Sequence, residues 1–184
     1  LKQAWMAIDQ IDSDLEKKLD YAFDGQLGYL TACPTNLGTG IRVSAMLHLP
    51  GLVLAEQIHQ IVQSVNKLGL AVRGLYGEGT EALGNVFQVS NQMTLGESEP
   101  DIVERLNKVL SQIIEHEENA RGTLIEKKPK HVFNTIGRAY GSLANAHSTN
   151  STAHRRLLAR TKPGIALNLF PGPDRATTHT LLTA

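Results

Sequence analysis

Apolar side chains recur at spacings of three and four residues in three long stretches of the chain, which predicts three amphipathic helices. The first stretch covers residues 1–23, the second covers residues 52–68, and the third follows Ser98 and ends near Gly122. Ser98 and Asp101, three residues apart, are typical of a capping box, in which side chains bind the free amide groups of a helix start. We therefore expect the third helix to begin directly after Ser98.

Apolar and polar residues alternate strictly from Ile41 to Leu49, which predicts a strand with one face against the core. Further short strands are expected over residues 27–32, 70–76 and 85–92. Where a loop alone joins two consecutive strands, it is too short for a parallel crossover, so these strands should pair antiparallel. The predicted fold class is α+β, with an antiparallel sheet flanked by helices. The residues of the first strand that should face the core are Ile41, Val43, Ala45, Leu47 and Leu49, and those on the opposite face are Arg42, Ser44, Met46 and His48.

The composition is that of an ordinary globular protein, with 41% hydrophobic and 20% charged residues among 184. No apolar run reaches the roughly 18 residues of a membrane span, and the start of the chain does not have the pattern of a signal peptide. We therefore expect a cytoplasmic protein without a membrane partner. One cysteine excludes an internal disulfide framework and a cysteine-rich zinc site. Because the chain begins with Leu inside a helical pattern, we expect a fragment or a processed piece of a longer protein.

Charge divides the chain into two parts. Residues 1–126 hold 17 of the 18 acidic residues and 9 of the 18 basic ones, whereas residues 127–184 hold nine basic residues and one acid, Asp174. The acidic first part argues against nucleic-acid binding, which needs clustered Lys and Arg. We expect a domain over residues 1–146, with a last helix at 131–146. The basic tail over residues 147–184 should be poorly ordered, because it is rich in polar residues and lacks a core.

Few side chains suggest chemistry. Neither a Walker phosphate loop nor a dinucleotide fingerprint occurs. Glu115-His116-Glu117 is interpreted as solvated helix surface, and no metal site is expected. Arg42 and Arg73 are unusual because they lie inside predicted strands, and Lys67 is the one other basic residue between positions 19 and 104. Each arginine could bind phosphate as a bidentate fork, or it could extend from a strand edge into water.

Three further residues lie near these arginines in the sequence. Glu78 and Glu81 belong to a glycine-rich loop after Arg73. A carboxylate beside a phosphate site would repel the nucleotide, so we expect it to serve a cationic acceptor such as a guanidinium or an ammonium group. Cys33 is either a small buried hydrophobe or, if it lies near the arginines, a stabilised thiolate.

Several segments resemble one enzyme family. Residues 28–42, with Cys-Pro-Thr-Asn-Leu-Gly-Thr inside them, closely resemble the signature of the ATP:guanido phosphotransferases. Residues 72–85 and 88–92 look most like the bacterial protein arginine kinase branch of that family. The resemblance covers about residues 1–146 and includes residues 137–146. It implies a partial guanido kinase catalytic domain, which transfers the γ-phosphate of ATP to arginine side chains of proteins.

The resemblance also implies roles for individual residues. Cys33 and Glu78 match catalytic residues of the family, with Glu81 as the rival of Glu78. Tyr76 stands where kinases of small guanidino compounds carry a second arginine, and this favours the protein arginine kinase branch. ATP would bring Mg²⁺, which is held mainly by the nucleotide. The residues that match ATP contacts are Arg42, Val43, Ser44, Ala45 and Met46, followed by Arg73, Gly74, Leu75, Tyr76, Gly77 and Glu78.

The partners implied by the resemblance are arginine-containing protein substrates, an activator protein and a Clp-type protease system. Two alternatives stay open: a phosphagen-type kinase of free arginine, and a non-catalytic adaptor with the same fold. After Ala146 the sequence departs from the pattern expected of the family. A frameshifted reading or a foreign segment is therefore our hypothesis for residues 147–184.

Overall fold

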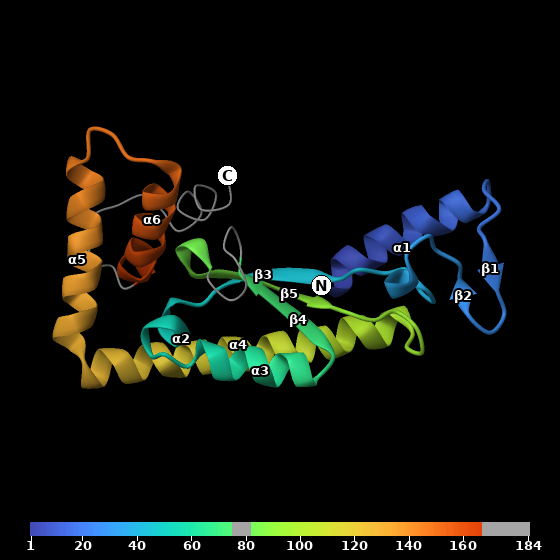
Figure 1. Cartoon of the computed structure of the whole chain (residues 1–184), viewed down its shortest axis with the longest axis horizontal. Helices are drawn as coiled ribbons and strands as arrows, with labels where there is room; N and C mark the ends of the chain where they lie inside the picture. Colours follow the sequence, from blue (N-terminus) through green and yellow to red (C-terminus); the bar gives the residue numbers. More distant parts are fainter. Residues whose placement is uncertain (75–81, 167–184) are drawn as a thin grey trace.

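The computed structural model describes residues 1–74 and 82–166. A central sheet with its helices separates α1 and a small hairpin at one end of the molecule from α5 and α6 at the other (Figure 1). In chain order the elements are α1 (Lys2–Glu16), β1 (Phe23–Asp24), β2 (Gly28–Tyr29), the 3-10 turn η1 (Pro34–Asn36), β3 (Ser44–His48), α2 (Pro50–Leu54), α3 (Ile58–Lys67), β4 (Leu70–Gly74), the 3-10 turn η2 (Leu83–Asn85), β5 (Val86–Asn91), α4 (Glu99–Lys127), α5 (Pro129–Asn145) and α6 (Ser151–Ala166).

The central sheet has the order β3-β5-β4, and both pairings are antiparallel. The predicted antiparallel sheet is therefore confirmed, with β5 in its centre. The alternation predicted for the first strand is confirmed as well, since Ser44 and Met46 are exposed while Ala45 and Leu47 pack against the core. The strand expected at 27–32 is only the two-residue β2, which pairs with β1 in a separate hairpin.

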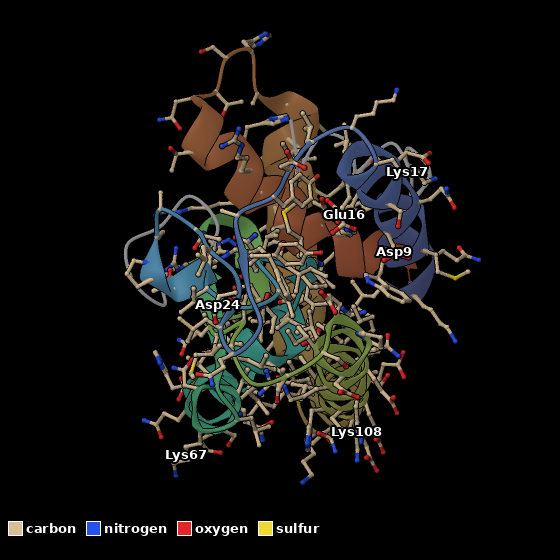
Figure 2. The ribbon with its side chains drawn as sticks, turned by 90° about the vertical axis from the view of Figure 1, so that its right-hand side faces the viewer. Asp9, Glu16, Lys17, Asp24, Lys67 and Lys108 are labelled. Atoms are coloured by element: carbon tan, nitrogen blue, oxygen red, sulfur yellow. The ribbon has the colours of Figure 1, made fainter. Side chains whose placement is uncertain are left out.

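The core lies between the sheet and the helices α2, α3 and α4, which cover one face of the sheet (Figure 1). Phe87 and Val89 of β5 point into it, and Leu52 of α2 and Leu106 of α4 pack against them, each of the four at most 2% exposed. Ser44 and Met46 of β3 lie exposed on the opposite face of the sheet. Figure 2 shows Lys67 of α3 and Lys108 of α4 at the outer surface of this helical layer.

Three predicted helices differ in length from the observed ones. α1 ends at Glu16, and none of its residues is buried, so packing does not extend it to residue 23. The helix predicted over 52–68 is interrupted, because Glu56 adopts a positive φ of 59° between α2 and α3. α4 begins after Ser98, whose side chain accepts from the Asp101 N–H as predicted, but it continues past Gly122 to Lys127. One helical glycine costs only about 1 kcal/mol, which a long packed helix tolerates.

The structure also differs from the expected poorly ordered tail. The helix predicted over 131–146 is present as α5, and α6 follows it over residues 151–166. Leu158 and Ala159 of α6 are 7% and 0% exposed, and Leu143 of α5 packs against them. Few apolar residues suffice here because α6 lies alongside α5, a contact that composition does not reveal. Residues 167–184 lie outside the described part of the chain.

Glu117 contradicts the interpretation of Glu115-His116-Glu117 as solvated surface. Its side chain is buried, and its two oxygens accept hydrogen bonds from the N–H groups of Gly51 and Leu52, each at 2.8 Å. Arg121, one turn later on α4, pairs with the same carboxylate. The buried charge is thus compensated at the start of α2, and it fixes α2 to α4.

Within residues 1–74 and 82–166, no helix has both the length and the apolar character needed to cross a membrane.

Candidate functional site

The open face of the sheet carries a row of three side chains. Gln88 of the central strand is paired with Met46 of β3 on one side and with Arg73 of β4 on the other. Directly paired residues point to the same face of a sheet, and Met46 and Arg73 are both exposed. Gln88 Nε2 also donates to Ser44 Oγ at 3.1 Å. Three of the predicted ATP-binding residues, Ser44, Met46 and Arg73, therefore share one accessible surface.

The remaining predicted ATP-binding residues differ in burial, and some lie outside the described part of the chain. Val43 and Ala45 pack against the core, and the Val43 N–H and carbonyl oxygen are both bonded to Asn91, so this part of the strand offers a ligand no side chain of its own. Arg42 precedes β3 and is exposed, and Gly74 is the half-buried last residue of β4. Leu75, Tyr76, Gly77 and Glu78 lie outside the described residues, and so does the catalytic candidate Glu81.

Cys33 lies in the loop that leads to this face, immediately before η1. It is exposed, which contradicts the alternative of a small buried hydrophobe. Its Sγ lies 3.1 Å from Thr35 Oγ1. Hydrogen bonds from the Thr35 hydroxyl and from the Thr35 backbone lower the pKa of Cys33, and the charge of Arg42 lowers it further. The loop therefore favours the thiolate, as expected for a cysteine close to an arginine.

Two residues of this region were missed by the sequence reasoning. Asn91 ends β5 and is 1% exposed, and Thr94 follows it at 4% exposed. Asn91 binds the backbone of Ile41 and Val43, on either side of Arg42, and Thr94 binds that of Leu37. Their signal in the sequence is weak, because polar residues after a strand usually mark a solvated turn. Only the pairing partners of the strand show that this end of β5 is enclosed.

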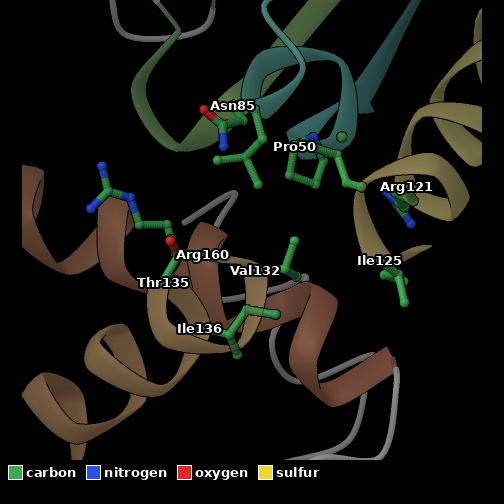
Figure 3. Close-up of a pocket in the computed structure, with 11 residues that line it drawn as sticks. Pro50, Asn85, Arg121, Ile125, Val132, Thr135, Ile136 and Arg160 are labelled. Carbon is green, nitrogen blue, oxygen red and sulfur yellow. The ribbon is translucent and has the colours of Figure 1, made fainter. Parts of the chain in front are cut away.

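Two hollows open in the surface, and the larger one reaches the segment before Arg42, since Thr39, Gly40 and Ile41 line it. One, of about 160 Å³, opens between α2, α4, α5 and α6, with Pro50, Val132 and Ile136 among its largely apolar lining (Figure 3). The other, of about 620 Å³, lies between α1 and the β2 region, and carboxylates such as Asp9 and Glu16 line it (Figure 2). Neither is lined by Cys33, Arg42 or Arg73.

The described residues offer little to a metal ion. Over 1–74 and 82–166, no group of three or more His, Cys, Asp or Glu side chains lies close enough together to hold one.

Comparison with known proteins agrees with the segments quoted from the sequence. The family model "ATP:guanido phosphotransferase, C-terminal catalytic domain" matches residues 1–120. A curated protein-arginine kinase of Bacillus licheniformis is 50% identical over 172 residues, which is 94% of this chain and 47% of that protein. One of Bacillus cereus strain G9842 is 49% identical over 175 residues, 95% of this chain and 49% of that protein. The chain spans about half the length of these relatives.

Solved structures agree in fold. A lombricine kinase superimposes with a TM-score of 0.53 at 31% identity, over 65% of this chain and 32% of that one. The substrate-free duplicated taurocyamine kinase of Schistosoma mansoni gives 0.54 at 32% identity, over 68% of this chain and 17% of that one. The α+β fold expected from the resemblance is thereby confirmed.

The aligned length also bears on the tail. An alignment of 172 residues is longer than residues 1–146, so the likeness to the Bacillus licheniformis protein continues beyond residue 146. This argues against a foreign or frameshifted origin of the whole stretch from residue 147. A family model that covers 120 residues and relatives that share half of the aligned positions lead to one conclusion: the chain belongs to the ATP:guanido phosphotransferase family.

Proposed function

We propose that the chain is the catalytic part of a protein arginine kinase, which transfers the γ-phosphate of ATP to arginine side chains of proteins. The observation that carries this proposal is the graded identity of its relatives. Identity is 49–50% to curated protein-arginine kinases over nearly the whole chain, but 31–32% to kinases named for lombricine and taurocyamine. Arg73 on the open face and the exposed Arg42 before β3 support the choice of a phosphate-bearing ligand.

Arg42 and Arg73 supply the phosphate contacts in this proposal. A guanidinium is planar and always charged, and it donates two parallel hydrogen bonds to a phosphate. Ser44 and Met46 line the same face with their side chains. Val43, Ala45 and Gly74 stay nucleotide contacts in this proposal on the strength of the family resemblance, as do Leu75, Tyr76 and Gly77 of the next segment.

The chemistry requires that the acceptor guanidinium lose a proton. Its pKa lies above about 12, so it stays protonated in water. A nitrogen of the acceptor attacks the γ-phosphorus, the bond from phosphorus to the β–γ bridging oxygen breaks, and the proton passes to a carboxylate. We assign this carboxylate to Glu78, with Glu81 as the rival. The Cys33 thiolate adds a negative charge that helps to orient the acceptor.

Magnesium enters this proposal with the nucleotide. It would neutralise charge on the transferring phosphoryl group. No cluster of acidic or imidazole ligands within the described residues competes for that role, so the proposal leaves the ion on the phosphates. Because the relatives are about twice as long, the complete active site is proposed to need the full-length parent protein.

The experiment that tests the proposal uses the full-length parent enzyme with γ-labelled ATP. An arginine-rich protein and free arginine are offered separately, and acid-labile phosphoarginine is measured in each. We expect label in the protein and none in free arginine. Label in free arginine would favour the phosphagen-type alternative, and no transfer to either would favour the adaptor. The activator protein, the Clp-type protease system and the cytoplasmic location stay predictions from the family resemblance.

A further inference from the structure

Two buried polar side chains lie at the end of the central strand β5 and just beyond it. Both contact the segment that carries Cys33 and Arg42. They are Asn91, 1% exposed, and Thr94, 4% exposed. Burying a polar group is unfavourable unless it is hydrogen-bonded. The partners of these two side chains therefore show what they hold in place.

The Asn91 amide binds the backbone on both sides of Arg42. Its Oδ1 accepts from the Val43 N–H at 2.8 Å, and its Nδ2 donates to the Ile41 carbonyl oxygen at 3.0 Å. Nδ2 also donates to the Met93 carbonyl oxygen at 3.2 Å. A side-chain amide has one acceptor oxygen and two N–H donors, so each of its polar groups is used. The peptide units next to Arg42 cannot turn without breaking one of these bonds.

Thr94 binds the loop that follows Cys33. Its hydroxyl lies 2.7 Å from the Leu37 carbonyl oxygen and 3.3 Å from that of Thr35. Its own carbonyl oxygen accepts from the Thr39 N–H at 3.1 Å and from the Thr39 hydroxyl at 3.3 Å. The approach is so close that a Cβ on Gly38, where φ is +104°, would lie 2.5 Å from the Thr94 carbonyl oxygen. Gly38 therefore permits the contact.

Together these bonds attach the chain between Cys33 and Arg42 at every second residue. The attached residues are Thr35, Leu37, Thr39 and Ile41. Cys33 and Arg42 are themselves exposed, so packing of their own side chains does not fix them. Thr35 is also the residue whose hydroxyl contacts the Cys33 thiol. Hydrogen bonds from the end of β5 thus reach Thr35, which contacts the Cys33 thiol, and the two peptide units beside Arg42.

We propose that Asn91 and Thr94 are positioning residues, which set the separation of the Cys33 thiol and the Arg42 guanidinium by fixing the backbone between them. Thr94 acts through Thr35, and Asn91 acts through the peptide units on either side of Arg42. Neither side chain needs to touch a substrate for this. The inference rests on the proposed function only in its kinetic consequence, because the geometry itself can be tested without phosphoryl transfer.

The test on this 184-residue chain uses Cys33 as its own probe, since it is the one cysteine of the sequence. Alkylation by iodoacetamide is followed across a pH series for the wild type, Thr94→Val and Thr94→Ser. Arg42 is the charged group among the described residues that acts on this thiol, so the profile reports its placement as well. Thr161→Val is the matched control, because Thr161 is a second buried threonine, 3% exposed, whose hydroxyl bonds Leu158 in α6.

We expect Thr94→Val to move the alkylation profile to higher pH and to slow alkylation at pH 7 by at least about twofold, since less thiolate is present. Thr94→Ser should restore the profile, and Thr161→Val should leave it unchanged. A wild-type profile in folded Thr94→Val would overturn the proposal, as would an equal shift in Thr161→Val. Thr39→Val removes a half-buried hydroxyl that donates to the Thr94 carbonyl oxygen and accepts from the Ile41 N–H at 3.4 Å. It gives a milder second test if Thr94→Val does not fold, with a smaller shift in the same direction expected.

The kinetic arm uses the full-length parent enzyme. Asn91→Asp keeps the acceptor for Val43 but loses both donors, so we expect a KM for ATP raised by about tenfold with a smaller change in kcat. Thr94→Val should instead lower kcat. If the thiol profiles change as expected but the enzyme transfers no phosphate to protein, the positioning role stands and the proposed function is refuted. Unchanged profiles and unchanged kinetics in an active enzyme would refute the positioning role alone.

Discussion

Cys33 Sγ, directly before η1, and Thr35 Oγ1, within η1, lie 3.1 Å apart. With the thiolate as acceptor, the threonine hydroxyl is the donor, and this bond is the largest cause of the lowered pKa of Cys33. A threonine two positions after the cysteine thus lowers the pKa of the thiol. Arg42, nine positions later, adds its charge to the same effect.

Removing that hydroxyl should move the Cys33 titration toward its usual range. A pKa below the usual one means that the thiolate, and with it alkylation, is present at lower pH than in an ordinary cysteine. We expect the alkylation profile of Thr35→Val to lie at higher pH than that of the wild type. Thr31→Val is the control, because the Thr31 hydroxyl binds the Cys33 carbonyl oxygen and not the thiol. An unchanged profile in Thr35→Val would assign the lowered pKa to the two remaining causes, the hydrogen bond from the Thr35 backbone and the charge of Arg42.

Glu117→Gln should destabilise the fold. The amide can accept from only one of the Gly51 and Leu52 N–H groups, and its NH₂ group then faces the other donor, while the ion pair with Arg121 is lost. A buried polar group without its partner costs about 1–3 kcal/mol of unfolding free energy. Denaturant titration should show this loss. The exposed neighbour Glu118, changed to Gln, should stay within about 0.5 kcal/mol of the wild type; equal effects of the two changes would show that Glu117 is not the anchor of α2.

α6 should be an ordered helix that depends on its contact with α5. Leu158 is 7% exposed there, and truncating a buried leucine removes about 2–5 kcal/mol of packing energy. We expect Leu158→Ala to speed hydrogen exchange and proteolysis across residues 151–166, while the exposed Arg156→Ala leaves both rates near those of the wild type. If residues 151–166 of the wild type are cleaved as quickly as in Leu158→Ala, the helix is not packed as described.

Sequence patterns predicted those parts of the fold that depend on neighbouring residues. The alternation from Ile41 to Leu49 placed Ser44 and Met46 on the open face, and Ser98 marked the start of α4. The same reasoning failed where a distant partner decides. Glu117 is buried because α2, some 65 residues earlier in the chain, offers two N–H groups to it.

The candidate site shows the same division. Arg42, Arg73 and Cys33 could be named from residue type and resemblance, and the first two are exposed, as a phosphate-binding role requires. Asn91 could not be named, because its role follows from the antiparallel pairing that brings the end of β5 beside residues 41–43. The composition of residues 147–184 did not predict α6 either, because a few apolar residues are enough to hold a helix that packs alongside another one.

Glu78→Gln in the full-length enzyme tests the proposed proton acceptor. The change keeps the shape of the side chain and removes its charge. Loss of a general base typically costs about 10²–10⁴-fold in rate, so we expect protein-arginine phosphorylation to fall at least about a hundredfold with melting and ATP binding nearly unchanged. Glu81→Gln should have the smaller effect. The reverse order would transfer the role to Glu81, and two mild variants would remove this loop from the proton transfer.

The most direct test of the whole account is the rate of phosphoarginine formation by the full-length enzyme when single arginines become lysines. Lysine keeps the charge but not the bidentate fork, and one tenfold change in rate corresponds to about 1.4 kcal/mol. The account predicts that Arg42→Lys and Arg73→Lys each lower kcat/KM for ATP by at least about tenfold. Arg138→Lys, an exposed arginine on α5, should retain wild-type activity. Full activity in both Arg42→Lys and Arg73→Lys would contradict the claim that the open face of the sheet binds the phosphates.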